Sequence, residues 1–117
     1  MTIENAEIAL VRFVAERTGS TVNSTVFRGE LPPGTTGAAV CFTGGRPAGT
    51  DLAEFSATVS GAFAEPAEAR AFADALWGGL PVCNTSGFTR IAAAGELSFF
   101  VSGGKYHVDG KLAVAFF

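Results

Sequence analysis

Charge is scarce in this sequence. Only 16% of the 117 residues are Asp, Glu, Lys or Arg, whereas an average soluble protein has about 25%. A domain with so few charges leaves neutral and apolar side chains on its surface, which favours a subunit of an assembly over a free monomer. The net charge is −3, and the eight basic residues are scattered from Arg12 to Lys111. Because no basic stripe can neutralise phosphates, we expect no direct contact with nucleic acid.

Histidine and cysteine, the usual sources of nucleophiles and metal ligands, are equally sparse. His107 is the single histidine, and Cys41 and Cys83 are the only cysteines. Either cysteine could pair with His107 as nucleophile and base if folding brought them together, but no local sequence pattern supports this. A metal site needs three or four clustered ligands, and these residues show no such spacing. We therefore expect no catalytic residues, no metal and no cofactor, with both cysteines reduced and in the core.

A long apolar run is also missing. None approaches the roughly 20 residues of a membrane-spanning helix. Glu4 and Glu7 stand where a secretion signal would carry positive charge. The sequence thus predicts neither a membrane span nor a signal peptide. Its length predicts a single domain over residues 1–117, long enough to bury a sizeable core.

Glycine, by contrast, is abundant, and the glycine-rich residues 43–49 invite a phosphate-binding interpretation. This stretch lacks the Gly-Lys-Ser/Thr ending of a P-loop and the three-glycine spacing of a dinucleotide-binding turn. Pro47 also removes a backbone donor. We interpret the stretch as a simple connection between strands.

The best-defined pattern is a strand followed by a helix, over residues 55–80. Apolar residues alternate with polar ones from Phe55 to Phe63, which predicts a strand with one buried face. Pro66 then stands in the first turn of a helix, and Gly78 and Gly79 provide its stop signal. The apolar positions recur at helical spacing and are Ala69, Phe72, Ala73, Leu76 and Leu80.

A second amphipathic helix is predicted from residue 3 to about residue 17, with Thr2 as its N-cap and Gly19 at its end. Ile8 and Val11 fall outside its core stripe, so apolar surface extends past what one sheet face would cover. Two interpretations remain open: a loop of the same chain covers these residues, or a neighbouring subunit does. The core stripe itself comprises Ile3, Ala6, Leu10, Phe13 and Val14.

The remaining segments are predicted as strands, at residues 21–28 and 38–42, and as a strand pair after a loop at residues 80–87. Two dipeptides compete for the turn of the last pair, at residues 103–104 and 109–110. The first sets Val101 opposite Tyr106 and keeps one apolar face continuous to Phe116, so matched patterns favour it. Residues 105–117 then form one long strand.

Gly110 lies inside that strand, as a bulge or as a point of close approach. The expected order is helix, three strands, helix and a strand pair. It predicts an α+β fold, with a mainly antiparallel sheet and both helices packed on one face.

This layout resembles the small tail terminator or minor capsid proteins of tailed bacteriophages. The resemblance spans nearly the whole chain, although the loops here are short on charge. It rests on the N-terminal helix, the Leu-Pro-Pro segment at residues 31–33, the Thr-Gly-Gly-Arg-Pro segment at residues 43–47, the helical segment at residues 68–76 and the long closing strand.

The resemblance implies a structural virion protein, not an enzyme, that closes the tail tube or joins the tail to the head. By analogy it implies a ring of identical subunits, six in the particle, which contacts other tail or neck proteins. It places the protein in the virion, and in the host cytoplasm before assembly. The surplus apolar surface of the first helix and the long final strand make Ile8, Val11 and Phe117 the candidate interface residues.

Two other classes remain open. One is a small ligand-binding or regulatory domain of ferredoxin-like build, a fold from which function cannot be read. It would show a concave pocket with convergent polar groups. The other is a cysteine-dependent enzyme, which would show a cysteine of lowered pKa beside His107.

Overall fold

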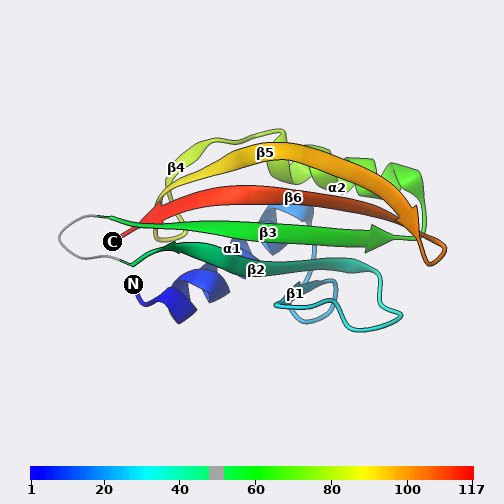
Figure 1. The fold of residues 1–117 in the computed structure, drawn as a ribbon, viewed down its shortest axis with the longest axis horizontal. Helices are drawn as coiled ribbons and strands as arrows, with labels where there is room; N and C mark the ends of the chain where they lie inside the picture. Colours follow the sequence, from blue (N-terminus) through cyan, green and yellow to red (C-terminus); the bar gives the residue numbers. More distant parts are fainter. Residues whose placement is uncertain (48–51) are drawn as a thin grey trace.

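The computed structural model describes residues 1–47 and 52–117. Within these residues the chain forms two helices and six strands that make one sheet, in the order β1-β2-β3-β6-β5-β4 (Figure 1). The elements are α1 (Ile3–Thr18), β1 (Val26–Arg28), β2 (Gly37–Arg46), β3 (Ala53–Phe63), α2 (Pro66–Trp77), β4 (Val82–Thr85), β5 (Phe88–Ser102) and β6 (Lys105–Phe116).

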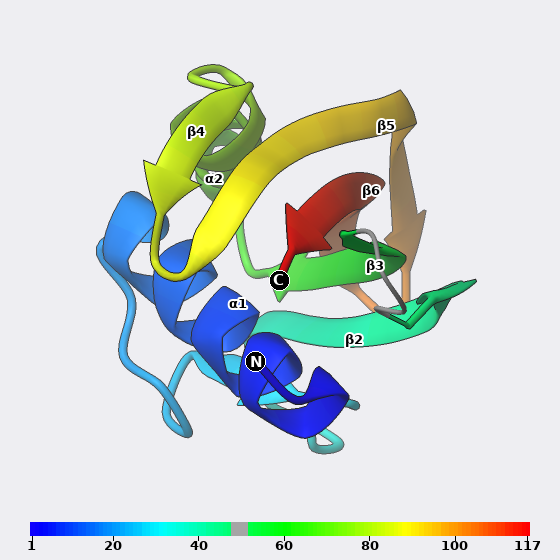
Figure 2. The same ribbon diagram turned by 90° about the vertical axis from the view of Figure 1, so that its left-hand side faces the viewer.

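The predicted α+β class is confirmed, and the sheet is mixed. Among the described strands, β1 pairs with β2 in parallel, and the other four pairings are antiparallel. Figure 2 shows that the sheet is strongly curled, so that β4 and β5 lie well out of the plane of β2 and β3. In Figure 1 both helices lie behind the central strands.

The predicted register of the last two strands is confirmed. Val101 pairs with Tyr106, and Phe99 pairs with Val108, around a two-residue turn at Gly103 and Gly104. Both glycines of the turn have positive φ, of 59° and 73°, as the favoured hairpin turn requires. The apolar face of β6 lies in the core, as expected from its alternation.

Several strand boundaries differ from the prediction. Residues 82–85, taken for part of a loop, form β4, because pairing with β5 outweighs a weak local pattern. Residues 43–46, taken for a connection, continue β2 as far as Arg46 past an irregularity between Phe42 and Gly44. The rest of that predicted connection, beyond Pro47, lies outside the described residues. The strand predicted at residues 21–28 is regular only at Val26–Arg28.

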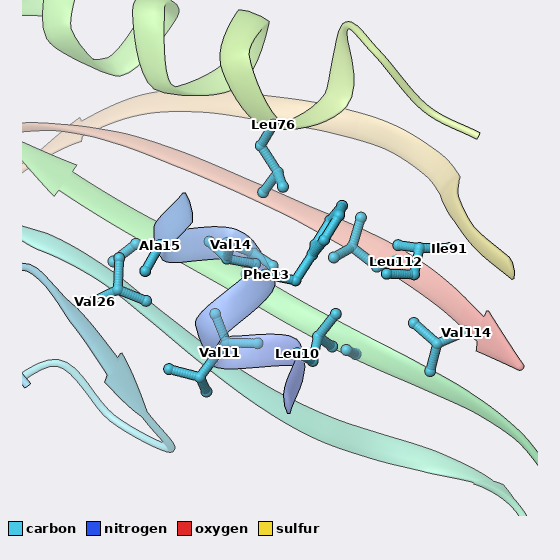
Figure 3. Packing of buried hydrophobic residues seen from close by; sticks show 14 of the residues in the cluster. Leu10, Val11, Phe13, Val14, Ala15, Val26, Leu76, Ile91, Leu112 and Val114 are labelled. Carbon is cyan, nitrogen blue, oxygen red and sulfur yellow. The ribbon is translucent and has the colours of Figure 1, made fainter. Parts of the chain in front are cut away.

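The termini of α1 are as predicted. The Thr2 hydroxyl accepts a hydrogen bond from the Asn5 backbone N–H at 3.1 Å, and Gly19 ends the helix with φ 67°. Figure 3 shows side chains of α1 gathered with Leu76 of α2 and Leu112 of β6 in one buried cluster.

The predicted core stripe of α1 is wrong at two positions. Val11 is only 2% exposed and belongs to the core, whereas Ile3 is 46% exposed. The hollow beside Val11 is lined by Val22, Asn23 and Arg28, so the segment after the helix covers this side of it. Of the two interpretations of this apolar surface, cover by the same chain therefore holds at Val11. Ile8 is half-buried.

Candidate functional site

The single histidine lies on β6, on the face turned away from the core. The His107 ring stacks on Phe100 with 4.8 Å between ring centroids and 3° between planes. Its Nε2 atom lies 3.0 Å from the Ser102 carbonyl oxygen, which accepts a hydrogen bond from it. These contacts hold the imidazole against its own hairpin.

Cys41 and His107 line one hollow of about 400 Å³, but they do not touch. Cys41 pairs with Thr58, and His107 pairs with Ala62, which in turn pairs with Gly37. The two residues are thus separated by two strand spacings and four positions along the strand. At standard sheet dimensions this is roughly 16 Å between Cα atoms, far beyond hydrogen-bond reach.

The environment of Cys41 also opposes nucleophilic chemistry. Burial, with the carboxylates of Glu7 and Glu30 nearby, raises the pKa of the Cys41 thiol. A reactive cysteine needs the reverse, since the thiolate is the nucleophile. This hollow therefore contains no activated cysteine.

Cys83 corrects another expectation. It was predicted in the core, but it is exposed on β4, because β4 is an edge strand that the sequence pattern did not predict. Cys41 is half-buried, and the two cysteines are not bonded to each other.

In residues 1–47 and 52–117, no group of three or more His, Cys, Asp or Glu side chains is placed to hold a metal ion. The helices that the structure describes are too short or too polar to cross a membrane.

The surface offers a more prominent feature, which is apolar exposure at the two ends of an elongated molecule. The extents are 47 × 24 × 22 Å. At one end lie Met1 and Phe117, 45% and 72% exposed, joined by a hydrogen bond from the N-terminal ammonium to the Phe117 carbonyl oxygen at 2.6 Å. With the neighbouring Ile3 they form the terminal patch. Figure 1 shows the two termini together at this end.

At the other end is the tip of the β5–β6 hairpin. Phe99, Phe100 and Val101 are 49%, 43% and 66% exposed, and we call them the tip patch. The predicted register of the hairpin places Phe99 and Val101 opposite residues of the apolar face. Their exposure was therefore not expected from the sequence. The available signal was the run Phe99-Phe100-Val101, which is apolar on both faces of a strand.

Between the two ends runs the sheet face that the helices do not cover, which we call the open face. Small and hydroxyl-bearing side chains dominate it, with Asp109 and Lys111 among them. Towards the terminal patch it contains a hollow of about 660 Å³ whose lining includes Ser56, Arg90 and Ala113. The residues of its central strands are Ala39, Cys41, Ser56, Thr58, Ser60, Ala62, His107, Asp109, Lys111, Ala113 and Ala115.

Comparison with known proteins brings no relative: no family model and no curated protein matches this chain.

Proposed function

We propose that this protein is a structural virion protein of a tailed phage or prophage. In this proposal it terminates the tail tube, or joins the tail to the head, as the subunit of a ring. The layout that resembles tail terminator and minor capsid proteins supports the assignment, and so does the low charge of the chain.

The observation that carries the proposal is that one molecule has two unlike exposed surfaces. The terminal patch projects large apolar side chains at one end, while the open face has a hollow whose lining combines small side chains with Arg46, Glu54 and Arg90. Large apolar groups on one copy can fill a hollow on the next. Such a contact is heterologous, and it closes into a ring when the rotation between neighbours permits.

The arrangement of the layers fits this contact. A mainly antiparallel sheet with both helices on one face leaves its other face for a neighbour. Ile8, half-buried on α1, and Phe117, at the end of β6, are the interface candidates that remain accessible. Val11 would contribute only indirectly, because its own chain covers it.

The proposal extends to the particle. The ring would contain six identical subunits by analogy with the resembled proteins, and it would contact other tail or neck proteins rather than nucleic acid or membrane. Its place is the virion, reached from the host cytoplasm, and no chemical step is required of it.

The test is to add charge to the proposed contact. In Ile8→Asp with Phe117→Asp, two carboxylates would replace apolar side chains that the proposed contact buries, so tail joining should fail. The matched control is Ala71→Asp with Ala75→Asp, which adds the same charge to the exposed side of α2. Both proteins are first shown to fold by circular dichroism. Normal yields of infectious particles from the interface variant would contradict the proposed contact.

A second candidate, a small ligand-binding or regulatory domain, is favoured by the hollow that Cys41 and His107 share. Its volume of about 400 Å³ and the hydroxyl groups of Thr58 and Ser60 suit a small polar ligand. A thermal-shift screen with metabolites separates the two functions. A saturable rise in melting temperature that Ser60→Ala abolishes would support the binding domain.

A further inference from the structure

The outer edge of β5 is unpaired along its second half. β4 covers β5 only where it pairs with Phe88, Arg90 and Ile91. From residue 92 to residue 102, no other strand of the described chain lies on that side. A sheet edge of this kind presents backbone N–H and C=O groups ready to pair with another chain.

The register shows which groups face outward. In a hairpin closed by a two-residue turn, the residues flanking the turn exchange hydrogen bonds, and bonded and non-bonded pairs then alternate. Ser102 and Lys105 flank the turn. Ser102 and Phe100 therefore direct their backbone groups towards β6, while those of Phe99 and Val101 point away from the sheet.

The same residues carry the exposed apolar side chains of the tip patch. Between Leu97 and Gly104 the chain has no charged residue and no proline, the two usual protections of an edge strand. Beside this edge is a hollow of about 220 Å³, lined by Pro66, Ala69 and Arg70 of α2 together with Phe99 and Val101. Backbone groups, apolar side chains and an empty hollow thus coincide at one short segment.

At the opposite side of the sheet, part of the strand edge is covered. β1 covers the first part of β2, and just beyond it the Phe42 N–H donates to Glu7 Oε2 at 2.7 Å. Glu7 is held in turn by Arg28, whose Nε lies 2.6 Å from Oε1. On that side β1 and a carboxylate thus satisfy part of the β2 edge, whereas the second half of the β5 edge is left open.

We propose that the open β5 edge pairs with the same edge of a second copy of this chain, antiparallel, about a twofold axis at Phe100. Phe99 of one copy then exchanges two backbone hydrogen bonds with Val101 of the other, and the symmetric pair does the same. Phe99 and Val101 of both copies share the helix side, where the hollow beside α2 receives them. The two Phe100 rings meet on the open face.

A second copy is the occupant because the edge is complementary to itself. The outward-bonding residues, Phe99 and Val101, are equidistant from Phe100, so two identical strands satisfy each other without a second surface. Residues 97–104 themselves bring no like charges together in the pair, and the charged side chain beside them, Arg70, lies over the Phe99 ring of its own copy, 5.8 Å from the centroid. A twofold contact uses the β5 edge of both copies, so strand addition stops at two copies and does not continue into a fibre.

This contact goes beyond the proposed ring and does not depend on it. The ring contact uses the terminal patch and the open face away from the tip, and it joins unlike surfaces. The β5 contact joins like surfaces at the other end of the molecule. Evidence against the β5 contact would leave the ring proposal intact. Evidence against the ring would likewise leave the β5 contact intact.

The test is a charge swap at Phe100, read by sedimentation velocity over a range of protein concentrations. Wild-type protein is expected to form a dimer as concentration rises. Phe100→Lys and Phe100→Glu each place like charges opposite one another and remove apolar burial, so each should weaken the dimer roughly tenfold or more. An equimolar mixture of the two variants should restore it. Ala71→Lys, on the exposed side of α2, is the charge-matched control and should dimerise like wild type.

A second variant covers the case in which the Phe100 substitutions disturb the hairpin. Val101→Pro removes an outward N–H and leaves the β5–β6 hydrogen bonds in place, so it should also weaken the dimer. Three results would overturn the proposal: wild-type protein that stays monomeric at millimolar concentration, dimers that persist in Phe100→Lys, or variants that fail to recover when mixed.

Discussion

At Gly110 of β6, a Cβ atom would lie 2.5 Å from Leu97 Cδ2 and 2.5 Å from Trp77 Cζ2. The indole of Trp77 lies close against this strand, and its Nε1–H donates to the Lys111 carbonyl oxygen at 3.2 Å. Of the two interpretations of this glycine, close approach is confirmed. The extra residues of the sheet lie instead opposite Gly110, on β5 between Ala94 and Ser98.

Gly110→Ala should therefore destabilise the fold. The added methyl group must displace Leu97 or Trp77, and overpacking of this kind costs about 1–3 kcal/mol in the free energy of unfolding, measured by chemical denaturation. Gly44→Ala is the control, because a Cβ at Gly44 meets nothing within 4 Å. Its effect should stay within about 0.5 kcal/mol. Equal losses at the two glycines would contradict the close approach.

Glu7 is the residue whose importance the sequence pattern least suggested. In the sequence it argues only against a secretion signal, yet its carboxylate joins α1, β1 and β2 through Phe42 and Arg28. Its side chain is 18% exposed, and its hydrogen bond raises the pKa of Arg28. A bridge between residues this far apart in sequence has no local pattern, so only the folded chain shows it.

Glu7→Ala should cost about 1–3 kcal/mol in unfolding free energy, because the partly buried Phe42 N–H loses its acceptor. Glu7→Gln retains an acceptor oxygen and should cost less. Glu4 also faces Arg28, but at 3.5 Å and with a side chain 71% exposed, so Glu4→Ala should change stability by less than about 0.5 kcal/mol. The denaturation midpoints of the three variants provide the measurement. A loss of stability in Glu4→Ala as large as that in Glu7→Ala would contradict the special role of Glu7.

At the scale of elements, local patterns were sufficient wherever one periodic face meets one buried surface. The alternation of β3 and β6 and the spacing of α2 predicted their buried faces, and the glycine pair predicted the last hairpin. Local patterns failed where a second contact decides burial. Val11 is buried by the segment after α1, and β4 exists because β5 pairs with it. Neither contact leaves a periodic signal in the sequence.

Leu76 tests the central element contact. It is fully buried in the cluster that α2 shares with α1 and the sheet. Leu76→Ala should cost roughly 2–5 kcal/mol, because the surrounding side chains relax only partly into the cavity. The exposed Asp74→Ala, on the same helix, should be close to neutral. A loss below about 1 kcal/mol for Leu76→Ala would mean that α2 packs through another face.

At the scale of the whole molecule, the candidate interfaces were only partly predictable. Low charge predicted association, and Phe117 and Ile8 were identified from patterns. The tip patch was missed because Phe99 and Val101 pair with Val108 and Tyr106 on the core side of the sheet and yet are themselves exposed. Apolar exposure at both ends of an elongated molecule is a property of the fold, which periodicity cannot report.

The last prediction concerns the physical character of self-association. The β5 edge carries no charge from Leu97 to Gly104, so burial and backbone hydrogen bonds should dominate the proposed β5 contact. Salt screens charge pairs but does not weaken apolar burial. Raising sodium chloride from about 50 mM to about 500 mM should therefore change the dissociation constant by less than roughly threefold. Sedimentation at both concentrations provides the measurement, with Phe100→Lys, in which salt screens the opposed charges, as the salt-sensitive control. A dissociation constant that rose steeply with salt would show that ion pairs hold the copies together, contrary to the proposed β5 contact.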